Sequence, residues 1–198
     1  AMSQRTRSFG VLALVLWGLG AWAQPTYLLR PHREVPIGLS VAGMGAFNIW
    51  AAPAVKGFTL AELDALEPTH IPAWDQWALG RWNEGAGHRS DYLFYGAALW
   101  SSATVLLPAL NEGEWQASLP TAVMWVEMNA LTLVATDLTK NLVTRPRPFT
   151  YYSDAPMEAR LEVDARKSFF SGHTSMTAAN TFYAAKVFSD LYPDSKMK

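Results

Sequence analysis

The sequence lacks cysteine altogether, which excludes disulfide bonds and thiolate metal sites. This absence leaves the redox compartment open, because an exported protein need not contain disulfides. The chain also has little net charge, since 16 lysine and arginine residues stand against 17 aspartate and glutamate residues. A nucleic-acid-binding protein normally carries a basic face, so we expect no nucleic-acid partner. A length of 198 residues suits one domain with a sizeable core.

Charged residues are missing from long stretches of the chain, although the mean hydropathy is only +0.02. Residues 35–55 and 92–111 contain no lysine, arginine, aspartate or glutamate, and residues 115–139 contain only two, both acidic. A helix needs about 20 apolar residues to cross a bilayer. We therefore expect an all-α fold, a polytopic helical membrane bundle. A soluble bundle with unusually apolar helices is the alternative.

The N-terminal residues 1–23 combine a basic start, a short apolar run and small residues at Ala21 and Ala23. This pattern predicts a secretory signal peptide cleaved between Ala23 and Gln24, with a retained hydrophobic helix as the alternative. The remainder, residues 24–198, is predicted to form one domain. A signal peptide implies export to, or insertion in, the inner membrane of a bacterium-like cell.

The segments between the apolar stretches are expected to lie at the membrane surface. Thr59 and Glu62 have the spacing of a capping box, which predicts a short helix after Thr59. The tryptophans within residues 73–82 indicate a helix that lies on the membrane or packs against the spans. Residues 83–91 are predicted to form a loop. Glu127 is costly in lipid, so we expect it to face the bundle interior or lie near an interface.

A first polar cluster follows the apolar run at residues 115–139. Lys140 and Arg147 lie seven residues apart at or just past the end of a predicted helix, and Pro146 and Pro148 stiffen the chain around the arginine. An ammonium group and a guanidinium fork are suited to binding a tetrahedral oxyanion such as phosphate. Taken alone, these residues are more typical of a basic loop that sets membrane topology or touches anionic lipids.

A second polar cluster opens the fourth predicted helix, which runs from about Ser171 to Leu191. Ser171 has the character of an N-cap, and Gly172 allows a ligand to approach the backbone. Free N–H groups at a helix start favour an anion. His173 is placed to give a proton to a leaving oxygen. The alternative for a histidine at a helix start is a capping or packing role.

Together, Lys-x6-Arg-Pro (residues 140–148) and Ser-Gly-His (residues 171–173) resemble the phosphatidic acid phosphatase type 2 family, a superfamily that also contains the vanadium haloperoxidases. The resemblance covers roughly residues 35–198 and points to the membrane lipid phosphatase branch. It implies an all-helical fold with the active site at the membrane surface. Hydrolysis in this family needs no metal and no cofactor.

The resemblance also assigns roles to particular residues. Lys140 and Arg147 would bind the phosphate, and Ser171 and Gly172 would add hydrogen bonds to it. His173 would act as the general acid that protonates the leaving group. The substrate would be a phosphorylated lipid of the phosphatidic acid, phosphatidylglycerol phosphate or undecaprenyl diphosphate class.

Two features depart from the family pattern. Phe170 occupies the position where the family usually has proline before Ser-Gly-His, which affects only the turn. The third family motif, Ser-Arg-x5-His-x3-Asp, which supplies the nucleophilic histidine, is not found in these 198 residues. The sequence is therefore interpreted as a phosphatase domain that is incomplete at its C terminus and nearly inactive by itself.

Two other functions remain open at this point. One is a non-catalytic membrane protein that binds anionic lipid through the same basic loop, and the other, less favoured, is a vanadium haloperoxidase. The family generally places its active site on the periplasmic face of the membrane. If residues 35–55, 92–111 and 115–139 all cross after signal-peptide cleavage, however, the loop after Lys140 falls in the cytoplasm.

Overall fold

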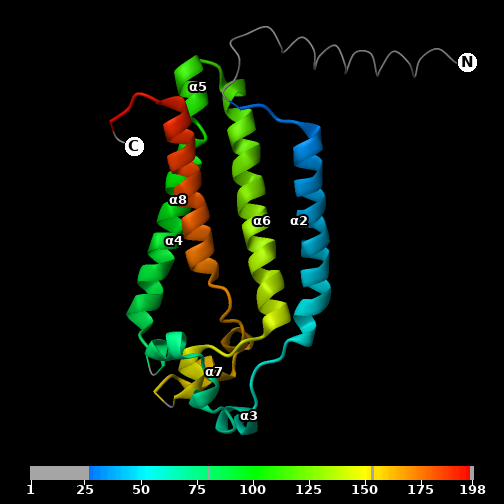
Figure 1. Cartoon of the computed structure of the whole chain (residues 1–198), viewed down its shortest axis with the longest axis vertical. Helices are drawn as coiled ribbons and strands as arrows, with labels where there is room; N and C mark the ends of the chain where they lie inside the picture. The colour runs from blue at the N-terminus through cyan, green and yellow to red at the C-terminus, as the bar shows by residue number, and fades with distance from the viewer. Residues whose placement is uncertain (1–26, 80, 153, 197–198) are drawn as a thin grey trace, which may run out of the picture.

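The computed structural model describes residues 27–79, 81–152 and 154–196, so the predicted signal peptide at residues 1–23 lies outside the described residues. Every regular element in the described part of the chain is a helix, which confirms the predicted all-α fold. Four long helices form a bundle (Figure 1). They are α2 (Pro31–Ala51), α4 (Glu84–Thr104), α6 (Leu119–Val143) and α8 (Gly172–Leu191). Helix α8 packs against both α4 and α6, and α2 packs along α6.

Short elements occupy the two ends of the bundle (Figure 1). Helix α5 (Leu107–Glu112) lies at the end where α2 begins, and it is followed by the 3₁₀ helix η4 (Trp115–Ser118). The opposite end holds helices α3 and α7, where α6 ends and α8 begins. The remaining short elements are η1 (Ala52–Ala54), α3 (Leu60–Asp64), η2 (Pro68–His70), η3 (Ala73–Ala78), η5 (Pro148–Tyr151), α7 (Met157–Leu161) and η6 (Val163–Arg166).

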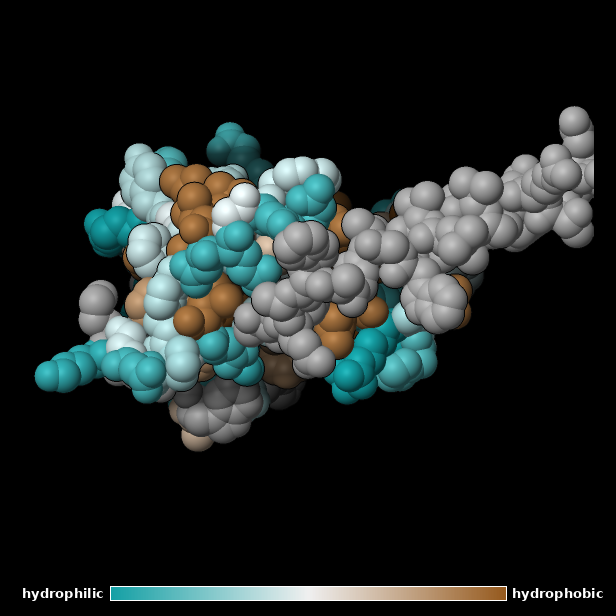
Figure 2. Space-filling model, turned by 90° about the horizontal axis from the view of Figure 1, so that it is seen from above, coloured by the Kyte–Doolittle hydropathy of each residue, from teal (hydrophilic) through white to brown (hydrophobic). Residues whose placement is uncertain are grey.

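Among the residues that the structure describes, three helical segments are long and apolar enough to cross a membrane, which confirms the predicted helical membrane bundle. These segments are Pro31–Ala54, Glu84–Glu112 and Trp115–Tyr151. Figure 2 looks at the end of the bundle where α2 begins, and it shows hydrophilic residues around smaller hydrophobic patches. A polar end on an apolar bundle suits a molecule whose ends lie at the bilayer surface.

The contacts between the helices are made largely by small and polar side chains. Ser101 on α4 and Thr121 on α6 are fully buried, whereas Ile49 and Leu99 point outward with exposed fractions of 80% and 73%. Lipid tails are as apolar as leucine, so helix association in a membrane depends on close packing and hydrogen bonds instead of apolar burial. The distribution of residues therefore supports helices that face lipid with their apolar sides.

A hydrogen-bonded network joins three of the long helices at mid-bundle. Trp125 on α6 donates its indole N–H to Ser101 Oγ at 2.8 Å, and Ser101 donates to the side-chain oxygen of Asn180 on α8. Asn180 Nδ2 donates in turn to Asn129 Oδ1 at 2.8 Å. Because an unpaired polar group in a membrane interior is costly, this network fixes the register of α4, α6 and α8.

The predicted helix starts are observed at two positions. Thr59 and Glu62 form the expected capping box before α3, in which Thr59 Oγ1 accepts the Glu62 N–H at 3.2 Å and Glu62 Oε2 accepts the Thr59 N–H at 2.8 Å. Ser171 caps α8, since its hydroxyl oxygen accepts the Thr174 N–H at 3.3 Å. The local side-chain pattern was therefore sufficient to predict where α3 and α8 begin.

Two expectations about connecting segments need correction. Residues 83–91 do not form a loop, because Asn83 caps α4 by accepting the Ala86 N–H at 2.9 Å and the helix starts at Glu84. The helix expected within residues 73–82 is not a regular α-helix in its described part either, since residues 73–78 form the 3₁₀ helix η3. The first correction matters for function because it places Asp91 on a rigid helix.

Candidate active site

Lys140 and Gly172 come together where α6 ends and α8 begins. A β-carbon added to Gly172 would lie 3.4 Å from Lys140 Nζ and 3.5 Å from Thr136 Cγ2. The missing side chain of Gly172 thus lets the lysine ammonium group lie against the first turn of α8. Free N–H groups at a helix start and an adjacent cation both favour a bound anion.

Ser171 contributes to the start of α8 in a structural role. Its hydroxyl accepts hydrogen bonds from the Thr174 N–H at 3.3 Å and from Thr174 Oγ1 at 3.1 Å. Ser175 Oγ also donates to the Ser171 carbonyl at 2.8 Å. The hydroxyl of Ser171 is therefore occupied as a helix cap, and its predicted hydrogen bond to phosphate would have to be added to these contacts.

His173 is held by two residues of α4 that the sequence reasoning did not single out. Its Nε2 atom lies 2.8 Å from Asp91 Oδ1, and its ring packs edge-to-face against Phe94 with 5.3 Å between ring centroids. Both His173 and Asp91 are about half exposed. A carboxylate on one ring nitrogen fixes the orientation of an imidazole and the position of its proton.

The guanidinium group of Arg147 is engaged in contacts within the protein. Its Nη2 atom forms an ion pair with Asp164 Oδ2 at 2.5 Å, and its Nε donates to the Asp164 carbonyl at 3.0 Å. The backbone N–H of Arg147 donates to the Ala165 carbonyl at 2.7 Å. The guanidinium fork thus holds the loop after α6 against η6, and a phosphate would have to replace the Asp164 carboxylate.

A pocket of about 330 Å³ lies between the start of α4 and the loops after α6. Arg147 and Asp91 both line this pocket, so it connects the predicted phosphate-binding arginine to the partner of His173. Its other charged and titratable side chains are Glu84, His88, Glu162 and Asp164. With four carboxylates and one arginine, the pocket is unfavourable for an anion as it stands. A phosphate is better placed at the Lys140 side, at the start of α8.

The other arginines of the loop after Lys140 have structural partners. Arg145 forms an ion pair with Asp75, and Arg166 pairs with Glu62 at 2.6 Å. Arg160 is buried and donates from Nε and Nη2 to the Thr150 carbonyl at 3.2 and 3.0 Å. These contacts shape the loop that covers the end of the bundle, so the basic character of the loop does not by itself report on membrane topology.

Asp91 is a candidate site residue that the sequence analysis missed. The sequence held part of the signal for its position, since asparagine is a favoured N-cap residue and Asn83 could have predicted that residues 84–91 are helical. The pairing of Asp91 with His173, 82 residues away, depends on the packing of α4 against α8 and had no local signature.

The comparison with known families supports the predicted resemblance. The family model described as PAP2 superfamily matches residues 121–196, the part of the chain that runs from α6 to just past α8 and carries both motifs. The predicted resemblance to this superfamily is thereby confirmed for residues 121–196, and the match supports a phosphatase-type fold in general for this part of the chain. No curated protein and no solved structure gives a significant match.

Proposed function

We propose that the protein is a membrane phosphatase that hydrolyses phosphate or diphosphate esters of lipids. The observation that carries this proposal is the contact between Lys140 and Gly172, which unites the two motifs within the segment that matches the PAP2 superfamily. Candidate substrates are phosphatidic acid, phosphatidylglycerol phosphate and undecaprenyl diphosphate. Helices able to cross a membrane favour a lipid substrate over a soluble one.

In the proposed reaction, a histidine attacks the phosphorus atom and the bond from phosphorus to the leaving oxygen breaks. His173 gives its proton to that oxygen, and water then hydrolyses the phosphohistidine. Lys140 and the N–H groups at the start of α8 stabilise the phosphoryl oxygens, and Arg147 joins them by exchanging Asp164 for the phosphate. The nucleophilic histidine of the third motif is not among these 198 residues, so we propose that the 198-residue chain is inactive alone.

Replacing the phosphate-binding cations tests the proposal. Lys140→Ala and Arg147→Ala should each lower phosphate release by about 100-fold or more in the active form of the protein, because each removes charge that stabilises the transition state. Lys56→Ala is the matched control, as this lysine is exposed in the connection before α3. Near-normal activity of a folded Lys140→Ala variant would remove this residue from the site.

A second candidate function is non-catalytic binding of anionic lipid. It is favoured by the pairing of Arg147 with Asp164, which occupies the guanidinium group assigned to phosphate. Binding of inorganic phosphate by the 198-residue chain is expected under both functions. Turnover by a chain extended with its native downstream sequence is expected only of the enzyme.

We further propose that the protein resides in a bacterial inner membrane with its site facing the periplasm. In the observed bundle α2 starts at the end opposite Lys140 (Figure 1). If α2, α4 and α6 all cross, a periplasmic site therefore requires α2 to start on the cytoplasmic side. A signal peptide cleaved before Gln24 would place that start in the periplasm instead.

Labelling with an impermeant thiol reagent in intact cells distinguishes these arrangements. The chain has no cysteine, so a single introduced cysteine is free of background. Glu158→Cys lies at the Lys140 end and Glu114→Cys at the opposite end, and both positions are exposed. Labelling of Glu158→Cys alone supports a periplasmic site, and labelling of Glu114→Cys alone contradicts it.

A further inference from the structure

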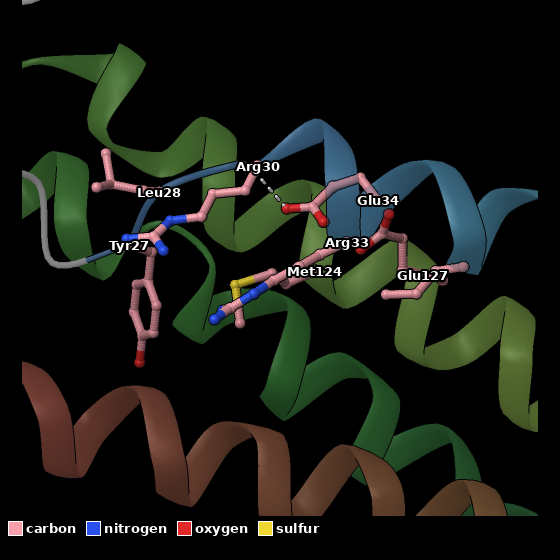
Figure 3. Close-up of a pocket in the computed structure, with 8 residues that line it drawn as sticks. Tyr27, Leu28, Arg30, Arg33, Glu34, Met124 and Glu127 are labelled. Carbon is pink, nitrogen blue, oxygen red and sulfur yellow. Dashed lines mark hydrogen bonds between the residues drawn. The ribbon is translucent and has the colours of Figure 1, made fainter.

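A charged cavity outside the candidate active site lies at the other end of the bundle, where α2 begins. It has a volume of about 380 Å³. Its lining comes from the segment before α2, from the first turns of α2 and from α6 (Figure 3). The lining residues used below are Leu28, Arg30, Arg33, Glu34, Met124 and Glu127.

The charges in this pocket are separated. Figure 3 shows the guanidinium groups of Arg30 and Arg33 on the side near Tyr27, and the carboxylates of Glu34 and Glu127 on the other side. Within the part of the chain that the structure describes, neither guanidinium group forms an ion pair with either carboxylate. Arg30 and Glu34 are joined through the backbone of Arg30 instead: its N–H donates to Glu34 Oε1 at 2.9 Å, and its carbonyl accepts the Glu34 N–H at 3.2 Å.

Glu127 makes this arrangement costly without a ligand. It belongs to the candidate span Trp115–Tyr151, and carboxylates within spans usually pair with a cation or line a functional cavity. Glu34 faces the same pocket from α2, so two carboxylates share one side of it. A cation between them would offset both the desolvation and the mutual repulsion of the carboxylates.

The segment before α2, which lines the pocket, is held in place by a contact with helix α8. The Tyr27 hydroxyl donates to Asp190 Oδ2 on α8 at 2.7 Å, which anchors the segment that carries Leu28 and Arg30. Burial and the Asp190 carboxylate raise the pKa of Tyr27 above its ordinary value, so the hydroxyl remains a donor at neutral pH. The arginine side of the pocket is therefore positioned by tertiary contacts as well as by α2.

We propose that this pocket binds the headgroup of a zwitterionic phospholipid, one that carries a phosphodiester and a primary ammonium group as phosphatidylethanolamine does. The phosphodiester would pair with Arg30 and Arg33, whose guanidinium forks suit its oxygens. The ammonium would donate hydrogen bonds to Glu34 and Glu127. Leu28 and Met124 provide apolar contact beside the headgroup, and the site lies in the leaflet opposite the candidate active site.

This chemistry discriminates among common lipid headgroups. Phosphatidylcholine has a quaternary ammonium group that cannot donate a hydrogen bond, and phosphatidylglycerol has no cation for the carboxylates. A hydrogen bond to a charged group contributes about 1.5–3 kcal/mol, so preference for the primary ammonium should reach about 10-fold or more. The proposal does not depend on phosphatase activity.

The test is competitive lipid binding to the detergent-purified 198-residue chain, measured by native mass spectrometry with three lipids that have identical acyl chains. Wild type should bind phosphatidylethanolamine about 10-fold more tightly than phosphatidylcholine or phosphatidylglycerol. Glu127→Gln should lose this preference while keeping affinity for the phosphodiester. Arg33→Gln should weaken binding of all three lipids, and Lys56→Gln is the matched control.

Soluble glycerophosphoethanolamine at millimolar concentration separates headgroup recognition from adhesion of acyl chains to the apolar bundle. It should displace phosphatidylethanolamine from wild type, whereas inorganic phosphate alone should displace it less. Equal binding of the three lipids to wild type would overturn the proposal. So would an unchanged preference in a Glu127→Gln variant whose helix content by circular dichroism matches wild type.

Discussion

At the scale of single residues, the most informative contact is that between His173 and Asp91. The hydrogen bond of 2.8 Å occupies one ring nitrogen of His173 and leaves the other available for the proposed role as general acid. In the proposed mechanism Asp91 is a positioning residue, since it would act through the histidine instead of touching the substrate. Phe94 supports the same ring orientation from the side.

Asp91→Asn should therefore lower kcat/KM by an amount that depends on the leaving group of the substrate. For an alkyl or lipid phosphate the loss should be about 10-fold or more, because the departing alkoxide needs the proton that His173 supplies. For p-nitrophenyl phosphate, whose leaving group needs little protonation, the loss should be clearly smaller. The measurement is the ratio of kcat/KM for the two substrates in the active form of the protein.

Glu162→Gln is the control for this measurement, because Glu162 lines the same pocket as Asp91. It should leave the ratio unchanged. Equal losses on both substrates for Asp91→Asn would reduce Asp91 to a packing residue of the α4–α8 contact.

Glu62 gives a second prediction at the residue scale. The Thr59 N–H, the Arg166 guanidinium and the Thr59 hydroxyl all stabilise its carboxylate and lower its pKa from 4.5 to about 2. A lowered folded-state pKa contributes stability that is present above about pH 4.5 and is lost as the pH falls toward 2. Thermal unfolding of wild type and Glu62→Gln in detergent should differ at pH 6 and converge near pH 2. A difference that is independent of pH would contradict the role of this ionised carboxylate.

At the scale of elements, the loops that cover the active-site end pack against one another through close backbone approach. A β-carbon on Gly57 would lie 2.1 Å from the Leu161 carbonyl oxygen, so this connection between α2 and α3 is pressed against the end of α7. No flexible side chain can relieve this contact, because the obstructing atom belongs to the backbone.

Gly57→Ala should accordingly destabilise the protein by about 1–3 kcal/mol, the usual cost of overpacking. Gly38→Ala is a matched control in α2, where a β-carbon meets nothing within 4 Å. That change should be neutral or stabilising by roughly 0.5–1 kcal/mol, because alanine is the better helix former. Urea titration measures the free energy of unfolding of both variants. Equal values would show that the connection between α2 and α3 accommodates the added β-carbon without loss of stability.

The hydrogen-bonded network of the bundle allows a prediction about helix packing. Asn180→Ala removes the partner of Ser101 and of Asn129, and the orphaned groups should cost about 1–3 kcal/mol. Thr181→Ala on the exposed side of α8 is the control, since Thr181 donates only to the Thr177 carbonyl of its own helix. Unfolding in mixed micelles measures both, and the account fails if the Asn180 variant is as stable as the control.

At the scale of the whole molecule, the sequence was sufficient to predict an all-α bundle with helices apolar enough to cross a membrane, and their approximate places in the chain. The uncharged stretches and the caps at Thr59 and Ser171 specify helices locally, so the all-α bundle and the start of α8 were predictable. The side-chain partners of the site residues could not be predicted from the sequence. Whether Arg147 meets Asp164, or Glu127 shares a pocket with Arg33, depends on how helices and loops pack.

The orientation of the bundle in the membrane also concerns the whole molecule. Because both motifs lie at the end opposite the start of α2, the fate of residues 1–23 decides on which side of the membrane the phosphate site lies (Figure 1). The pocket proposed to bind a lipid headgroup, at the start of α2, would then face the other leaflet. The two ends of the bundle are thus expected to contact lipids of different leaflets with different chemistry.

The most direct test of the central claim is phosphate release from phosphatidic acid and from undecaprenyl diphosphate. The purified 198-residue chain is compared with a chain extended by its native downstream sequence and with the His173→Ala variant of that extended chain. We predict turnover by the extended chain alone and its loss in the variant. Equal activity of the 198-residue chain would place the nucleophile within these residues and contradict the assigned roles.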